Sequence, residues 1–252
     1  MKNLILLSIT LGSQDIKQAY RRSALGAFWI TGAMALQIAT ITLVFGLLFK
    51  NPLSEYLPFV ATSIIIWGFI SNSLNDGCQS FIVGEGIIKQ LNIRPIMHIF
   101  RTYWKNLLTL AHNLAILPVA FLLVLKGATA TIFLLIPGFL VLSVNILWMM
   151  ILLGFLSARF RDIPPLVSST LMILLNLTPV FWYPKTLGDA SLGHLLLGLN
   201  PFYHLIQVTR LPILGQSPTP ENWLIAMSLS LIGWFVAGLV LKFYSHRLAY
   251  WV

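Results

Sequence analysis

The chain has 252 residues, of which 58% are hydrophobic and only 9% are charged, and its mean hydropathy is +0.86. A soluble domain of this size needs a polar surface that such a composition does not supply, so the sequence predicts an integral membrane protein with one domain, residues 1–252. The lone Cys78 excludes an internal disulfide, and the distribution of the formal charge of +9 is informative about topology.

The first residues form a short apolar run that is similar to a signal peptide, but no small-residue cleavage site follows it. We expect instead an amphipathic helix at about 13–28, with Ser13 as its cap and Asp15 in its first turn. A basic amphipathic helix lies in the headgroup plane of a membrane. It serves either as a positive-inside anchor or as a contact for an anionic lipid-linked substrate, through Lys17, Tyr20, Arg21 and Arg22.

Seven charge-free windows are long enough to cross a membrane, which takes about 20 mostly apolar residues. The window 190–209 contains glycines, two histidines and Asn200-Pro201, so a straight helix there would leave polar groups unsatisfied in lipid. We therefore predict an all-α protein with six transmembrane helices and, between spans five and six, a re-entrant periplasmic helix pair broken at Asn200-Pro201. The predicted spans are about 27–49, 56–76, 104–125, 130–157, 165–183 and 222–243.

The lysines and arginines support this topology. With six spans and a cytosolic N-terminus, 12 of them lie inside and 4 outside, whereas seven spans give 11 and 5. The positive-inside rule therefore favours six spans, with the N- and C-termini both cytoplasmic.

The segment at about 82–101 is too polar to span a membrane and too long for a turn. Polar residues interrupt its apolar ones, and Pro95 breaks any continuous helix. It is either a solvated connector or a short cytosolic helix that docks on a partner. The residues in question are Glu85, Lys89, Gln90, Arg94 and Pro95.

A second charged stretch, "SARFRDIPP" at 157–165, lies in the short cytosolic turn between spans four and five. Asp162 is placed to cap the next helix or to pair with Arg159 or Arg161, and Pro164 suits an early helix position.

The extracytoplasmic segment at about 184–221 carries aromatic residues within it and on both sides of it. They fit either an interfacial aromatic belt or a channel mouth whose rings stack on sugars. These residues are Trp182, Tyr183, Phe202, Tyr203 and Trp223.

Several classes of function are excluded. The chain has no GxxxxGK[ST] phosphate loop, no HExxH or GxSxG motif and no Cys/His metal spacing. Its seven acidic residues, of which Asp76 lies at the end of a span, are too few for a proton-coupled carrier. The pair His112-Asn113 serves either helix packing or a pathway. We expect a transport path, not an enzyme, with an outside source of energy.

Three segments in order resemble the permease subunit of ABC transporters that export bacterial surface polysaccharides. They are "DIKQAYRRSALGAFWI", "SARFRDIPPLVSSTLMILLNLTPVFWYP" and "LNPFYHLIQVTR". A fourth segment resembles the group that exports lipopolysaccharide O-antigen, namely "IIKQLNIRPIMHIFRTYWKNLLTLAHN".

The resemblance implies a homodimer with its pathway at the dimer interface, in the bacterial inner membrane. Two copies of a cytosolic ABC ATPase would bind ATP and Mg, so this chain would hold no cofactor and no nucleic acid. The substrate would be an O-antigen-type polysaccharide on undecaprenyl pyrophosphate, moved from cytosol to periplasm. Capsular polysaccharide and teichoic acid are alternatives, and a drug or small-lipid exporter or an intramembrane transferase on lipid-linked sugars are less favoured ones.

The resemblance also assigns residues to roles. The substrate entrance would comprise Lys17, Tyr20, Arg21 and Arg22. Coupling to the ATPase would fall on Glu85, Lys89, Gln90, Arg94 and Pro95, with Arg161 and Asp162 in a smaller contact. The periplasmic gate would include Trp182, Asn200, Pro201, Tyr203 and His204. Arg94 departs from the pattern, because related chains often carry an aromatic residue before the proline.

Overall fold

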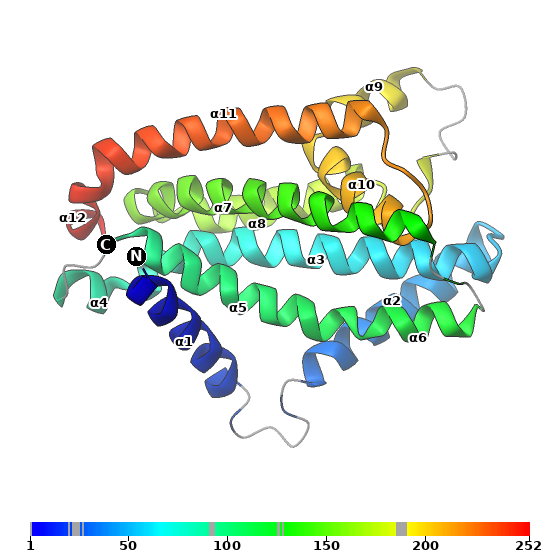
Figure 1. Cartoon of the computed structure of the whole chain (residues 1–252), viewed down its shortest axis with the longest axis horizontal. Coiled ribbons are helices and arrows are strands. Elements are labelled where there is room, and N and C mark those ends of the chain that lie inside the picture. The colour runs from blue at the N-terminus through cyan, green and yellow to red at the C-terminus, as the bar shows by residue number, and fades with distance from the viewer. Residues whose placement is uncertain are drawn as a thin grey trace.

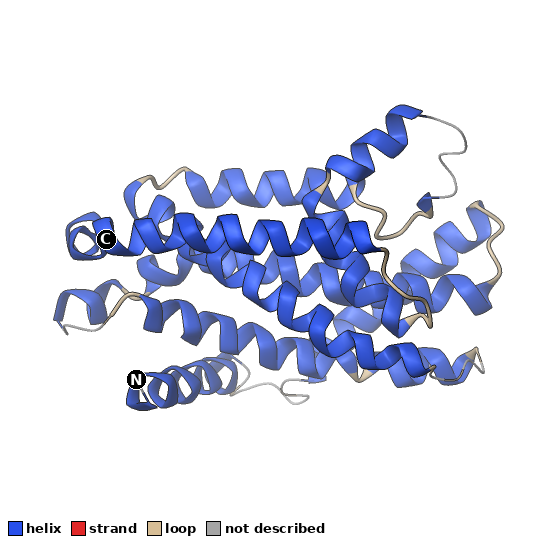
Figure 2. Ribbon diagram, turned by 45° about the horizontal axis from the view of Figure 1, so that its top comes forward, coloured by secondary structure: helices blue, strands red, loops and turns tan. Residues whose placement is uncertain are grey.

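The computed structural model describes residues 2–19, 21, 26, 28–90, 94–124, 127, 129–184 and 191–252, and every regular element in these ranges is a helix (Figures 1 and 2). The all-α class is therefore confirmed. In chain order the elements are α1 (Lys2–Ala19), α2 (Phe28–Leu48), α3 (Leu53–Val83), α4 (Glu85–Gln90), α5 (Ile96–Leu114), α6 (Ile116–Leu123), η1 (Ala130–Leu134), α7 (Leu135–Arg159), α8 (Ile163–Leu177), α9 (Ser191–Leu199), α10 (Pro201–Ile213), α11 (Pro220–Tyr244), η3 (Ser245–Arg247) and α12 (Leu248–Trp251).

Five helical stretches in the described residues are long and apolar enough to cross a membrane. They coincide with five of the six predicted spans. The sixth, predicted at 165–183, corresponds to α8, which has 15 residues and ends where Thr178 turns extended before Pro179. Fifteen helical residues rise roughly 22 Å, less than the hydrocarbon core of about 30 Å. The five stretches are Phe28–Leu48, Leu53–Val83, Ile96–Leu123, Ala130–Arg159 and Pro220–Trp251.

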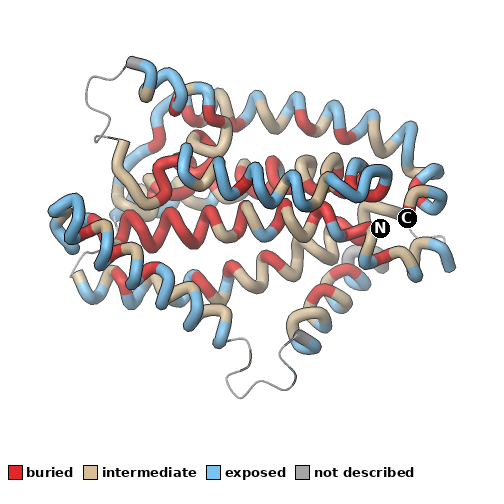
Figure 3. Tube along the Cα trace, turned by 180° about the vertical axis from the view of Figure 1, so that it is seen from behind, coloured by how far each residue is buried: buried red, intermediate tan, exposed pale blue. Residues whose placement is uncertain are grey.

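Helix α3 is the centre of the bundle. In the most apolar part of α3, 78% of the residues are buried. In the corresponding parts of α2 and of the stretch that contains α11, only 17% are buried. Figure 3 shows buried residues along most of α3, and α2, α5, α7, α8 and α10 all pack against it. The outer helices instead expose large apolar side chains, such as Leu47 and Leu231. Apolar surface of this kind suits contact with lipid, so the chain is a membrane protein.

Two glycines allow α3 and α7 to approach closely. A Cβ atom at Gly77 would lie 2.9 Å from Met150 Cγ, and one at Gly154 would lie 2.9 Å from Phe81 Cε2. Small residues at such crossings are typical of helices that pack in membranes.

We expect Gly154→Leu to lower the free energy of unfolding by about 3 kcal/mol, because the added side chain has no space beside Phe81 and Gly77. Unfolding in mixed micelles of a mild detergent and SDS measures this. The matched control is Gly238→Leu on α11, where a Cβ meets no atom within 4 Å. Equal losses for the two variants would contradict the prediction.

Helix α1 does not have the predicted bounds. It was expected at about 13–28 but extends from Lys2 to Ala19, and Arg21 and Gly26 lie in turns. Gly26, shortly before α2, has φ +56°, a left-handed conformation that glycine adopts readily. The predicted break at Asn200 is confirmed, since α9 ends at Leu199 and α10 begins at Pro201.

Candidate functional site

Two predicted coupling segments meet at one end of the bundle, where α4, α12 and the turn after α7 lie; we call it the α4 end (Figure 1). Lys89 Nζ lies 2.6 Å from Glu85 Oε1, and both side chains are nearly half exposed. The pKa of the Glu85 carboxyl is lowered, first by its hydrogen bond and charge interaction with Lys89 and then by the charge of Arg161. We call Glu85, Lys89 and Arg161 the coupling patch.

The other predicted coupling residues surround this patch in the chain. Gln90 and Arg94 are exposed, and Pro95 lies at the start of α5, where it separates that helix from α4. Asp162 occupies the N-cap position of α8 but makes no side-chain capping bond, and it joins none of the ion pairs formed by described residues. The expectation that Asp162 caps this helix or pairs with an arginine is therefore wrong, whereas Pro164 does lie early in α8.

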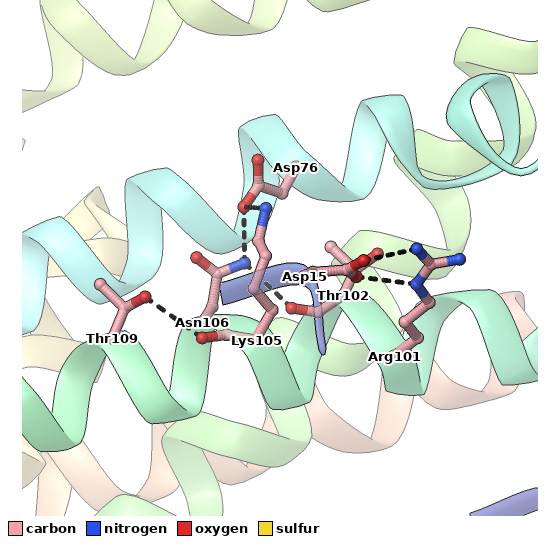
Figure 4. A network of polar contacts seen from close by, with 7 residues as sticks. All are labelled: Asp15, Asp76, Arg101, Thr102, Lys105, Asn106 and Thr109. Atoms are coloured by element: carbon pink, nitrogen blue, oxygen red, sulfur yellow. Dashed lines mark hydrogen bonds and ion pairs between the residues drawn. The ribbon is translucent and has the colours of Figure 1, made fainter. Parts of the chain in front are cut away.

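A network of charges joins α1, α3 and α5 (Figure 4). The Asp15 carboxylate on α1 accepts two hydrogen bonds from Arg101 on α5, at 2.8 Å from Nε and 2.6 Å from Nη2. One turn further along α5, Lys105 Nζ lies 2.7 Å from Asp76 Oδ2, and Asn106 Nδ2 donates to the same oxygen at 2.8 Å. The two ion pairs are thus held by consecutive turns of one helix.

Helix α1 is closely packed on α5 around this network. A Cβ atom at Gly12 would lie 2.6 Å from the Arg101 carbonyl oxygen, and Trp104 Nε1 donates to Ser13 Oγ at 3.0 Å. The sequence predicts Asp15 in the first turn of a helix and assigns it no ion-pair partner. A signal was present, because Arg101 and Lys105 are four residues apart and therefore lie on one face of α5, where they can meet acids from other helices.

Two polar cavities adjoin the network, with volumes of about 240 and 300 Å³. Asp15, Asp76 and Lys105 line both of them, so the ion pairs lie between the two spaces. The second cavity is also bordered by amide side chains. These are Asn72, Asn75 and Asn106.

The predicted entrance residues lie on and just after α1. Lys17 is exposed on the helix, and Arg21 is exposed in the turn that follows. Tyr20 and Arg22 fall outside the described residues. The two described cations are therefore both accessible on the surface.

Two of the predicted gate residues fasten the helix pair α9 and α10 to its neighbours. Asn200 accepts hydrogen bonds from the first backbone amides of α10, and its Nδ2 donates to Thr178 Oγ1 at 2.8 Å. His204 is 2% exposed, with Nδ1 2.9 Å from Asn222 Oδ1 and Nε2 2.9 Å from the Gly198 carbonyl oxygen. The hydrogen bonds of these two side chains therefore hold α9, α10 and α11 together.

The other predicted gate residues are less enclosed. Pro201 begins α10, and the Tyr203 ring packs edge-on to the His204 ring at 5.2 Å between centroids. Trp182 Nε1 donates to the Asn176 carbonyl oxygen at 3.0 Å, which closes the chain back onto the end of α8.

Arg210 is an arginine whose burial the sequence does not predict. The positive-inside count assigns it to the extracytoplasmic side of the membrane, and in the fold its side chain is only 1% exposed. Its Nη1 donates to Ser63 Oγ at 2.9 Å and to the Pro179 carbonyl oxygen at 2.6 Å, and its Nη2 donates to Gln207 Oε1 at 2.9 Å. The guanidinium carbon also lies 4.4 Å from the centroid of the Phe59 ring. One side chain thus connects α3, the end of α8 and α10.

The Arg210 charge has no carboxylate partner among the ion pairs of the described residues. Burial lowers the pKa of the guanidinium, but from so high a value that it stays charged at neutral pH. Arg210 borders a cavity of about 440 Å³ that Glu55 and Tyr183 also line. A buried charge held only by dipoles and an aromatic face is a costly feature, which makes this end of the bundle a candidate functional site.

No protein-family model matches this chain. Among known proteins, it is similar to the O-antigen export system permease protein RfbA of Klebsiella pneumoniae. The two are 23% identical over 184 residues, which cover 70% of this chain and 68% of that protein. The resemblance to an O-antigen export permease, expected from the sequence, is therefore confirmed.

Proposed function

We propose that the chain is the membrane subunit of an ATP-driven exporter that moves an O-antigen-type polysaccharide, linked to undecaprenyl pyrophosphate, from the cytosol to the periplasm. The observation that carries this proposal is the similarity to an O-antigen export permease over 70% of the chain. The five candidate spans and the helix pair α9 and α10 are compatible with it.

The energy would come from a separate ABC ATPase, two copies of which bind ATP and Mg. The coupling patch supports this role, because it joins two segments that are distant in the sequence into one exposed charged surface. Gln90, Arg94 and Asp162 extend that surface along the chain. Pro95 keeps α4 separate from α5, so that α4 can act as a docking helix.

The topology that fits this role has six spans, with α8 and the residues up to 183 together making the fifth. The α4 end then faces the cytosol, with both termini, and α9 and α10 form a re-entrant periplasmic pair. The 12-to-4 division of lysines and arginines supports this orientation.

Two copies of the chain would enclose the polymer path between them, since one bundle is filled by α3. Lys17, Tyr20, Arg21 and Arg22 would meet the pyrophosphate at the entrance. Trp182, Asn200, Pro201, Tyr203 and His204 would form the gate, with Arg210 holding it to α3.

Charge reversal in the coupling patch tests the energy source. We expect Lys89→Glu to abolish co-purification of the ATPase, because it breaks the pair with Glu85 and reverses the sign of the exposed surface. The chain is expressed with the ABC ATPases of its own genome, and captured ATPase and its rate of ATP hydrolysis are measured.

The matched control is Lys50→Glu, an exposed cation in the turn between α2 and α3, at the opposite end of α3 from α4. It should leave capture unchanged. Undiminished capture and hydrolysis in Lys89→Glu would remove the coupling role of α4, and failure of every ATPase to associate would remove the exporter itself.

A further inference from the structure

An apolar cavity lies between α7 and α11 at the α4 end and has a volume of about 570 Å³. Leu152 and Phe155 of α7 form one wall, and Val236 and Val240 of α11 form the opposite wall. None of the residues assigned above to the coupling patch, the entrance or the gate lines this space.

The cavity is positively charged where the helices end. Arg159, the last residue of α7, and Arg247, in η3, both line it and are both exposed. Neither belongs to an ion pair in the described part of the chain. The guanidinium carbon of Arg159 lies 5.6 Å from the Trp251 ring centroid, and that of Arg247 lies 6.0 Å from the Tyr244 ring centroid.

The cavity opens to the outside of the bundle. Besides the two arginines, four of its lining side chains are exposed, namely Leu156 at 46%, Phe160 at 54%, Val236 at 39% and Tyr244 at 41%. They continue the exposed apolar surface of α11, on which Leu231 and Phe235 are 76% and 69% exposed. In a membrane, an opening of this kind would face hydrocarbon, and the aromatic rings and arginines at the helix ends would suit the level of the headgroups.

We propose that this cavity is a binding site for an anionic phospholipid, whose acyl chain lies against Val236 and Val240 and whose phosphate lies between Arg159 and Arg247. Basic pockets between membrane helices at the cytoplasmic side favour such headgroups, and the arginine fork suits a phosphate. A zwitterionic lipid carries its own cation beside the phosphate, so its headgroup would be attracted less strongly by the two arginines. A protein that covered the same surface would have to supply a carboxylate for each arginine. The site is independent of the transported polymer.

Lipid binding to the purified full-length chain tests this site. Native mass spectrometry in mild detergent counts bound phosphatidylglycerol and, for comparison, phosphatidylcholine of the same acyl chains. We expect phosphatidylglycerol to bind more tightly, and Arg159→Gln and Arg247→Gln each to weaken it about fivefold with little change for phosphatidylcholine. Val240→Trp fills the apolar part of the cavity and should weaken both lipids.

The matched control is Lys242→Gln, which removes one charge from α11 outside the cavity and should leave phosphatidylglycerol binding within about twofold. Melting curves of each variant show that it is folded. Unchanged phosphatidylglycerol binding in Arg159→Gln and Arg247→Gln would overturn the proposal. So would full competition by inorganic phosphate, because the site would then take a phosphate without a lipid.

Discussion

Replacement of Arg210 by alanine is expected to lower the free energy of unfolding by about 3 kcal/mol. Three acceptors, Ser63 Oγ, the Pro179 carbonyl and Gln207 Oε1, then lose their donors inside the protein. Each buried group left unsatisfied costs about 1–3 kcal/mol, and removal of an unpaired buried charge offsets part of the sum. Unfolding by SDS in mild detergent, followed by far-UV circular dichroism, measures the difference.

Two further variants separate the causes. Arg210→Lys keeps the charge, but one ammonium does not reproduce the planar fork, so we expect it to recover less than half of the loss. Arg94→Ala removes an exposed arginine and should change stability by no more than about 0.5 kcal/mol. If Arg210→Met were as stable as the wild type, the hydrogen bonds of Arg210 would contribute no net stability.

The effect should also be visible in the gate. Arg210 fastens α10 to Ser63 of α3 and to the end of α8, while Asn200 and His204 hold α10 to Thr178 and Asn222. Without Arg210, only the hydrogen bonds of Asn200 and His204 from that set would still hold α10 in place. The backbone amides of α10 are therefore expected to exchange hydrogen faster than those of α7 in the same variant.

Much of the fold could be predicted because its signals are local. A charge-free run of 20 residues identifies a span wherever it occurs, and Asn200-Pro201 interrupts a helix through its own chemistry. The fifth predicted span is confirmed only in part, because the apolar window continues past Thr178 but helix α8 does not. Pro179 removes a backbone donor there, and the carbonyl of that same residue is the one that Arg210 binds.

The burial of Arg210 could not be predicted, because it depends on Ser63, which lies 147 positions away in the chain. A window of sequence contains only an arginine near the end of a helix, which usually faces water. The bounds of α1 were missed for the same reason. Ser13 has the chemistry of a helix cap, but in the fold its hydroxyl accepts the Trp104 indole N–H, and the helix continues through it.

The contact between Asp15 and Arg101 is expected to hold α1 against α5. Asp15→Ala leaves the Arg101 side chain, only 20% exposed, without its bidentate partner, and should lower the free energy of unfolding by about 2 kcal/mol. Hydrogen exchange of the α1 amides should accelerate in parallel. Glu221→Ala removes an exposed acid from α11 and is the matched control.

Exchange of the two charges, Asp15→Arg with Arg101→Asp, distinguishes a specific pair from the general loss of an acid. We expect the double variant to recover at least half of the stability lost by the two single variants, since the pair re-forms in the opposite direction. The carboxylate introduced on α5 would also gain Lys105 as a neighbour one turn along the helix. If the losses were additive instead, α1 would be held by its other contacts with α5, such as those of Gly12, Ser8 and Trp104. Under the proposed function the recovery matters for transport, because the same contact fixes the helix that bears the entrance residue Lys17.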